Sequence, residues 1–310
     1  MNLIAADIGG THSRFVWHTG SQSLQRGYEN ACFSDLNQVI DQFLRDLGHS
    51  DTQITHMVLG LPAPVDRPVI QLTNIDWQVD PEDLQRRFPV KALSLINDFQ
   101  AAALGALHDK QAARLNPDAP VKRSGPAVVA GAGTGLGHAW FADISSDAMP
   151  WATEGGHADF APQDRQQYEL HAWLSERHKG HVSLERVLSG AGLAALYEFL
   201  GGTSASAAEV QELARKNDAT AVEAIHCFVR IFGAHVGNVA LQFNPVAGIH
   251  LCGGVVAHLA DWFGQSFLSA VADKGRMRPH VESIPLFLHQ RHDIGLQGAL
   301  YIAKGKVELT

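Results

Sequence analysis

The chain has few cysteines and few basic residues, and each shortage excludes a class of protein. Its three cysteines, Cys32, Cys227 and Cys252, lie far apart without a C-x-x-C spacing, so we predict neither a disulfide framework nor a zinc site. The 24 Lys and Arg stand against 32 Asp and Glu, and the formal net charge is -8. That balance argues against nonspecific binding to nucleic acid, which requires clustered basic residues.

Long hydrophobic runs are also missing. No uninterrupted stretch reaches the roughly eighteen apolar residues that a membrane span needs. The first residues lack a basic segment followed by an apolar one, so we expect no signal peptide. We therefore expect a cytoplasmic protein without a membrane segment. The 310 residues, with 45% hydrophobic content, predict a globular protein that has a sizeable core and two domains.

The familiar phosphate-binding motifs are absent too. We find no G-x-x-x-x-G-K-[ST] loop, no dinucleotide-binding G-x-G-x-x-G with its acidic partner, and no protein-kinase signature. Instead, three glycine turns follow predicted strands: Gly9-Gly10-Thr11, Gly133-Thr134-Gly135 and Gly253-Gly254. Such turns let backbone N–H groups approach phosphate oxygens, and the threonine hydroxyls add donors. A single turn of this kind can simply reverse the chain, whereas three favour a nucleotide site.

Apolar periodicity predicts an α/β fold. Strands are expected at 3–8, 13–17, 57–61, 92–96, 127–130, 139–144, 249–252 and 284–288. Helices are expected at 35–47, from 80, and at 99–107, 165–177, 191–200, 207–216, 220–243, 255–267 and 294–303. Ser34 is placed to cap the first helix and Gly48 to end it. The opening strand–turn–strand pattern recurs at 127–144, after a polar connection at 108–125, which predicts a duplicated fold whose halves wall a cleft.

One aspartate stands inside an apolar strand and another directly after one, and each has two interpretations. Asp7 lies inside a strand where an unpaired buried carboxylate is costly. It either holds a hydrated Mg²⁺ or accepts hydrogen bonds from the adjacent glycine turn. Asp98, beside Asn97, either acts as a general base on a substrate hydroxyl or caps the helix that starts near Phe99. Position alone leaves both pairs of alternatives open.

Acids and an imidazole form a further candidate site. Two glycines separate Glu154 from His157, so both side chains can turn toward one ligand, and sugars are bound by networks of such donors and acceptors. Zinc is the competing ligand, but no third zinc ligand has a suitable spacing. Glu185 is interpreted, from the residues alone, as a capping or surface acid of a helix that begins near Ser183.

A more specific pattern is carried by short segments in a fixed order. They are ADIGGTHSR at 6–14, INDF at 96–99, GAGTGLG at 131–137, EGGHADFAP at 154–162, HVSLERVLSG at 181–190, CGGV at 252–255 and DKGR at 273–276. Together they closely resemble bacterial glucokinase, on the hexokinase branch of the actin-like ATPase superfamily. The resemblance covers essentially the whole chain.

The resemblance implies a two-domain actin-like ATPase (ribonuclease H-like) α/β fold with a central cleft. The small domain would contain 1–108 plus about 296–310, and the large domain 109–295. It implies a homodimer that phosphorylates D-glucose at the 6-hydroxyl with ATP and Mg²⁺, a glycolytic reaction.

The resemblance also implies residue roles. Asp98 would be the catalytic base. The sugar would be bound by Asn97, Asp98, Glu154, His157 and Glu185. The nucleotide would contact Asp7, Gly9, Gly10, Thr11, Gly133, Thr134, Gly135, Gly253 and Gly254, with Asp7 reaching Mg²⁺ through water.

The chain departs from the family pattern at a few positions, and rival functions are open. Cys252 replaces a small apolar residue, and His12 and His138 flank the phosphate turns, where a charged imidazole would make nucleotide affinity depend on pH. One rival is a related hexose kinase with another sugar preference, although the cysteine-rich zinc motif of the repressor–kinase branch is missing. A sugar-sensing transcription factor would need an N-terminal DNA-binding module, for which we expect no room. A non-catalytic sugar-binding paralogue is disfavoured by Asp98.

Overall fold

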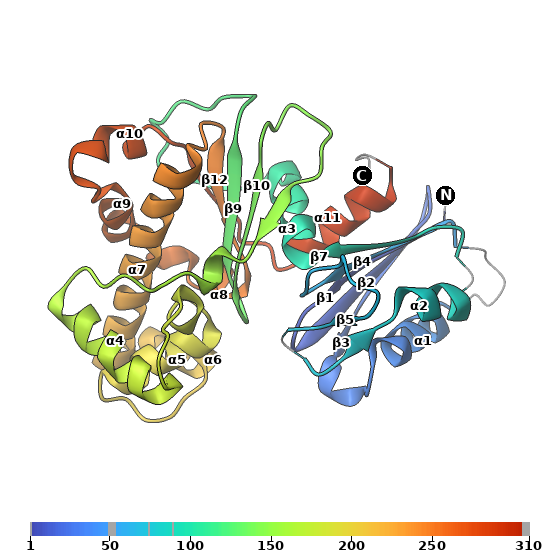
Figure 1. Cartoon of the computed structure of the whole chain (residues 1–310), viewed down its shortest axis with the longest axis horizontal. Helices are drawn as coiled ribbons and strands as arrows, with labels where there is room; N and C mark the ends of the chain where they lie inside the picture. The colour runs from blue at the N-terminus through green and yellow to red at the C-terminus, as the bar shows by residue number, and fades with distance from the viewer. Residues whose placement is uncertain (1, 49–53, 74, 89, 306–310) are drawn as a thin grey trace. The chain divides into compact units, whose positions relative to one another are not determined.

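The computed structural model describes residues 2–48, 54–73, 75–88 and 90–305. The chain divides into two compact units. Unit 1 comprises Met1–Lys110, Ser146–Ala152 and Asp293–Thr310, and unit 2 comprises Gln111–Ser145 and Thr153–His292. Each unit is built around a large mixed sheet (Figure 1).

The sheet of unit 1 has the strand order β3-β2-β1-β4-β7. Its strands are β1 (Leu3–Ile8), β2 (His12–His18), β3 (Ser23–Glu29), β4 (His56–Leu61) and β7 (Leu93–Asn97). β1 and β2 form the predicted hairpin, and β4 and β7 run parallel to β1. β3 was not predicted, because it is a largely exposed edge strand without apolar alternation. A separate small sheet pairs β5 (Ile70–Gln71) with β6 (Gln78–Val79).

Helices cover this sheet on both faces. On one face, α1 (Leu36–Leu47) buries a stripe of apolar side chains in a cluster with residues of β1, β2 and β4 and with Leu84 of α2 (Pro81–Arg87). On the other face, α3 (Asp98–His108) and α11 (Ile294–Ala303) pack against β4 and β1. The short 3₁₀ helix η1 (Asn30–Cys32) follows β3.

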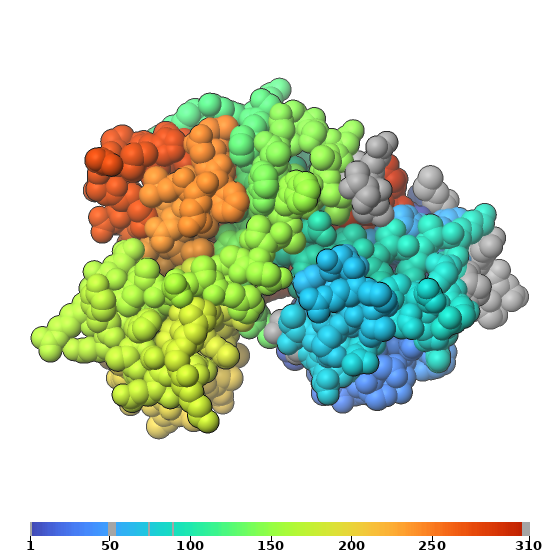
Figure 2. All heavy atoms as spheres, viewed as in Figure 1, coloured from blue at the N-terminus to red at the C-terminus, as the bar shows by residue number. Residues whose placement is uncertain are grey.

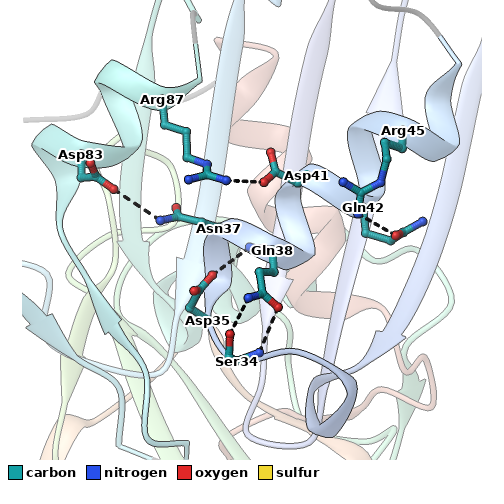
Figure 3. Close-up of polar contacts among 9 residues, drawn as sticks. All are labelled: Ser34, Asp35, Asn37, Gln38, Asp41, Gln42, Arg45, Asp83 and Arg87. Carbon is teal, nitrogen blue, oxygen red and sulfur yellow. Dashed lines mark hydrogen bonds and ion pairs between the residues drawn. The ribbon is translucent and has the colours of Figure 1, made fainter.

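Polar contacts fix the start of α1 and its neighbour α2 (Figure 3). The side chain of Asp35 accepts a hydrogen bond from the Gln38 N–H at 2.8 Å, so the helix is capped by Asp35 and the prediction of Ser34 was wrong. Ser34 instead donates its N–H to the Gln38 side chain. Gly48 ends the helix in a left-handed conformation, as predicted. Arg87 of α2 pairs with Asp41 of α1 at 2.6 Å.

The backbones of α3 and α11 touch where the two helices cross. A Cβ atom at Gly298 would lie 1.7 Å from the carbonyl oxygen of Ala101, and one at Gly105 would lie 2.0 Å from that of Ile294. Any larger side chain at either position would force the helices apart. The two glycines therefore allow the backbones of α3 and α11 to approach each other closely.

The sheet of unit 2 repeats the strand order of the first and adds β8 at one edge: β11-β10-β9-β12-β13-β8. Its strands are β8 (Ala113–Arg114), β9 (Ala127–Ala132), β10 (Leu136–Phe141), β11 (Trp151–Thr153), β12 (Gly248–Cys252) and β13 (Leu286–Leu288). β9 and β10 form an antiparallel hairpin, and β12 and β13 run parallel to β9. The predicted duplication is confirmed, although the bend between β9 and β10 is shorter than the expected 131–137.

The helical part of unit 2 surrounds one long helix. Its helices are α4 (Arg165–His178), α5 (Gly190–Phe199), α6 (Ala207–Arg215), α7 (Ala219–Phe243), α8 (Gly254–His258), α9 (Gln265–Ala272) and α10 (Arg278–Glu282), with 3₁₀ turns η2 (Gly155–His157), η3 (Leu184–Arg186), η4 (Ala260–Trp262) and η5 (Gly275–Met277). Figure 2 shows α4 to α6 as an exposed yellow-green lobe. Within the described ranges, α7 alone has the length and apolar character of a membrane span, but 78% of its most apolar window is buried in the protein.

The helix predicted at 255–267 is interrupted. α8 ends at His258, the 3₁₀ turn η4 follows, and α9 begins only at Gln265. Gly264, with a non-helical backbone, precedes the second piece. The apolar spacing misled the prediction because residues from both pieces, including Val256 and Phe267, are buried in the same core.

Candidate active site

The first glycine turn, in unit 1, is held in place by a buried asparagine. Gly9 donates its N–H to the carbonyl oxygen of His12 at 2.9 Å. Asn30, which is only 1% exposed, donates its side-chain N–H to the Gly9 carbonyl at 2.7 Å and its backbone N–H to the Thr11 carbonyl at 2.9 Å. Asn30 was not predicted, because its partner Gly9 is 21 residues away in the sequence. These hydrogen bonds therefore fix the backbone conformation of the turn. Thr11 is exposed at its surface.

Asp7 lies at the end of β1 with a side chain that is 19% exposed. Burial raises the pKa of its carboxyl group, the neighbouring Arg14 opposes this rise, and Asp293 adds to it. Arg14 Nη1 is 3.9 Å from the carboxylate. A Cβ at Gly295, in the first turn of α11, would lie 2.9 Å from Asp7 Cγ, so glycine is needed there to make room for the carboxylate.

The start of α3 settles which residue caps that helix. Asn97 Oδ1 accepts the Phe99 N–H at 2.9 Å and the Gln100 N–H at 3.3 Å, in a capping box with Gln100. The alternative in which Asp98 is the N-cap is therefore wrong. Asp98 is the first helical residue, and its Oδ1 accepts the N–H of Phe99 at 2.8 Å. Asn97 Nδ2 also donates to the Ala63 carbonyl at 3.3 Å, and the amide's second N–H can serve a ligand.

The two candidate aspartates of unit 1, Asp7 and Asp98, lie near Gly60 at the same edge of the sheet. Gly60 lies opposite Asp7 in the parallel pair β1–β4. A Cβ at Gly60 would lie 3.7 Å from Asp98 Cα and 3.4 Å from the Ala6 carbonyl. Asp7 and Asp98 thus border one small residue at the carboxyl ends of parallel strands, where α/β proteins bind ligands.

Unit 2 brings the other two glycine turns together. Gly133 donates its N–H to Gly135 O at 2.8 Å, and its own carbonyl accepts the N–H of Gly190 at 2.9 Å. A Cβ at Gly133 would lie 3.8 Å from Gly254 N. Gly253 has φ 101, and a Cβ there would lie 2.5 Å from Ala132 O, so only glycine fits. Thr134 is exposed at the tip of its turn.

The two segments of unit 2 that carry candidate sugar-binding residues both lie against Leu136 of β10. Glu154 Oε2 and His157 Nε2 are 3.7 Å apart, with side chains 69% and 57% exposed. A Cβ at Gly156, between them, would lie 1.9 Å from the Leu136 carbonyl. Glu185 Oε2 accepts the Leu136 N–H at 2.9 Å. The interpretation of Glu185 as a capping or surface acid was wrong, because its carboxylate anchors η3 to β10.

The structure also bears on zinc binding and on the charge of His138. Across the described ranges, no group of three or more His, Cys, Asp or Glu side chains could hold a metal ion. His138 is buried, and burial together with His235 lowers its pKa to about 3, so the imidazole is neutral at physiological pH. The idea that a charged His138 controls nucleotide affinity is therefore wrong. His12 is exposed beside the first turn.

Solved sugar kinases share this duplicated architecture. A glucokinase from an Antarctic psychrotroph aligns with a TM-score of 0.80 at 25% identity, over 98% of this chain and 99% of that chain. The glucokinase of Balamuthia mandrillaris, solved in complex with glucose, shares the fold with a TM-score of 0.81 at 19% identity, over 98% and 94% of the two chains. The fold is thus the actin-like fold of the sugar kinases.

Sequence comparison narrows this class to one family. The Glucokinase family profile matches residues 4–306. Glucokinases of Chromohalobacter salexigens and Nostoc punctiforme are 34% and 30% identical, over 96% and 97% of this chain and 95% and 98% of theirs. A longer relative, the bifunctional protein glk of Burkholderia lata, is 32% identical over 92% of this chain and 46% of its own length. The chain belongs to the Glucokinase family.

Proposed function

We propose that the protein transfers the γ-phosphoryl group of ATP to the 6-hydroxyl of D-glucose, giving glucose 6-phosphate and ADP. The family match across residues 4–306 carries this proposal. A solved relative of the same fold from Streptomyces griseus, in complex with glucose and AMPPNP, supports the pairing of this sugar with an ATP analogue.

Asp98 is the proposed general base. Its place in the first turn of α3, beside Gly60, gives it a fixed position at the strand ends. The glucose 6-oxygen attacks the γ-phosphorus, the bond from that phosphorus to the β–γ bridging oxygen breaks, and Asp98 accepts the hydroxyl proton. Because phosphoryl transfer requires little covalent chemistry from the protein, orienting this hydroxyl is the main task of the carboxylate.

The remaining assignments concern substrate binding. Sugar hydroxyls are assigned to Asn97, Glu154, His157 and Glu185. The phosphates are assigned to the turns Gly9-Gly10-Thr11 and Gly133-Thr134-Gly135, whose backbone N–H groups suit anions. Gly253-Gly254 is assigned to the adenosine. The resemblance, not a contact in the structure, is the support for a cytoplasmic homodimer.

Mg²⁺ is proposed to enter with ATP, and Asp7 fits a hydrated cation. Its carboxylate is largely buried with a raised pKa, so a nearby cation would favour the charged form, and Gly295 leaves space beside it. Asp7 would hold Mg²⁺ through water, since this ion keeps several of its waters. When bound, the ion neutralises charge that develops on the phosphates.

A coupled assay of ADP release against a panel of hexoses tests the proposal. Glucose with ATP and Mg²⁺ should give the highest kcat/KM, with mannose, fructose and N-acetylated hexosamines lower. A higher value for another hexose would favour the related-kinase alternative. Glucose binding without ADP release from any sugar would favour the non-catalytic paralogue.

A further inference from the structure

Two histidines that have no assigned role in substrate binding meet in the core of unit 2. His138 of β10 and His235 of α7 are 3% and 6% exposed, and their Nε2 atoms are 2.6 Å apart. Burial lowers the pKa of His138 to about 3 and that of His235 to about 4, and the positive charge of Lys274 also acts on His235. In such a neutral pair, one ring donates its Nε2–H to the Nε2 lone pair of the other.

The His138 ring also supports the loop that carries Glu154 and His157. A Cβ at Gly155, the first residue of η2, would lie 3.2 Å from His138 Nδ1 and 3.2 Å from Thr153 Oγ1. Gly155 in turn donates its N–H to Thr153 Oγ1 at 3.2 Å. Gly155 therefore lies close against the imidazole, and a side chain at this position would press on the ring.

Only one nitrogen of His138 is held by a hydrogen bond. Nδ1 is buried and has no hydrogen-bond partner within the part of the chain that the structure describes. The orientation of the ring thus depends on its Nε2 contact with His235. Loss of that contact would leave a second buried polar atom unsatisfied, which is costly, and the ring would turn or shift toward Gly155.

We propose that His138 and His235 are positioning residues for glucose, which together fix the ring that supports η2 and so place Glu154 and His157. This inference rests on the proposed function, because it takes those two side chains as sugar ligands. The pair acts through the loop and does not touch the reacting atoms. Its loss should therefore weaken glucose binding while Asp98 and the nucleotide turns keep their function.

Matched variants separate the hydrogen bond from simple packing. Asparagine places its amide near the position of imidazole Nδ1, whereas glutamine reaches that of Nε2. His138→Asn and His235→Asn should each raise the KM for glucose about tenfold, with kcat and the KM for ATP within about twofold of wild type. His138→Gln and His235→Gln should stay close to wild type. The double variant His138→Asn/His235→Asn should be no worse than either single one, because both break the same contact.

The chain offers a control in a second buried histidine pair. His250 Nδ1 and His289 Nε2 are 3.0 Å apart, and the His250 ring stacks on Phe287 of β13 at 4.5 Å. His250→Asn should lower the melting temperature but leave the KM for glucose unchanged, with all kinetics measured well below the melting temperature of each variant.

Three results would overturn the inference: wild-type KM values in both Asn variants, an equal rise in the Gln variants, or an equal rise in His250→Asn. Failure of the proposed function is distinguishable, because wild-type protein would then release no ADP with glucose.

Discussion

The backbone N–H of Leu136 donates a 2.9 Å hydrogen bond to the carboxylate of Glu185, and the carbonyl of the same residue lies against Gly156. Leu136 thus holds both segments of unit 2 that carry candidate sugar-binding residues. Glu185→Ala should raise the KM for glucose at least about tenfold, because it removes a ligand and leaves the Leu136 N–H unsatisfied. Glu185→Gln keeps an accepting oxygen and should have a smaller effect. Steady-state kinetics with glucose as the varied substrate would show whether the two variants differ in this order.

Asp98→Asn should lower kcat by about 10²- to 10⁴-fold, because an amide cannot accept the hydroxyl proton. The amide oxygen can still accept the N–H of Phe99, so the start of α3 should persist. Glucose affinity, measured by calorimetry, should change little. Near-normal turnover in this variant would refute the assignment of the base.

Local signals in the sequence were sufficient for most of the fold. The turn residues and strand periodicity predicted both hairpins, and Gly48 correctly marked the end of α1. The interruption at Gly264 was hidden because helical spacing continues across it. Ser34 was predicted as the N-cap in place of Asp35, because the sequence pattern alone cannot rank two adjacent residues of similar capping ability.

The site was less predictable, because its supports are distant in sequence. Leu136 and Glu185 are 49 residues apart, and Gly9 and Asn30 are 21 apart. His138 and His235, 97 residues apart, meet only because α7 packs on β10. A single sequence identifies polar residues at strand ends, but their contacts follow from tertiary packing.

Gly298→Ala should destabilise unit 1 by about 1–3 kcal/mol or more, because its Cβ would lie 1.7 Å from the Ala101 carbonyl. The helices would have to separate, which would displace the first turn of α3 and lower kcat as well. Gly20→Ala is the matched control, since nothing lies within 4 Å of its Cβ. Chemical denaturation should place the control within about 0.5 kcal/mol of wild type. Equal stability of the two variants would contradict the tight crossing.

Acid should destabilise unit 2 below about pH 6.5. Burial lowers the pKa of His138, His235 and His250 to about 3, 4 and 3, whereas unfolded imidazoles titrate near 6.5. The unfolded state therefore binds more protons, and stability falls as the pH drops from about 6.5 toward the folded pKa values. For each such imidazole, the free energy of unfolding should fall by about 2 kcal/mol between pH 7 and pH 5. Denaturation at several pH values should show a shallower decline for His250→Gln, and an identical slope would contradict this account.

Asp7→Asn should raise the Mg²⁺ concentration for half-maximal activity about tenfold and lower kcat, while glucose affinity stays unchanged, because the neutral amide attracts a hydrated cation weakly. Arg14→Gln provides a second, independent test. Arg14 lowers the pKa of Asp7 against the effect of burial, so its removal should raise that pKa further. The ionised form of Asp7 would then be lost at a higher pH, and the acid limb of kcat/KM for MgATP should move upward in pH. An acid limb that stays in place in Arg14→Gln and persists in Asp7→Asn would show that Asp7 does not control it.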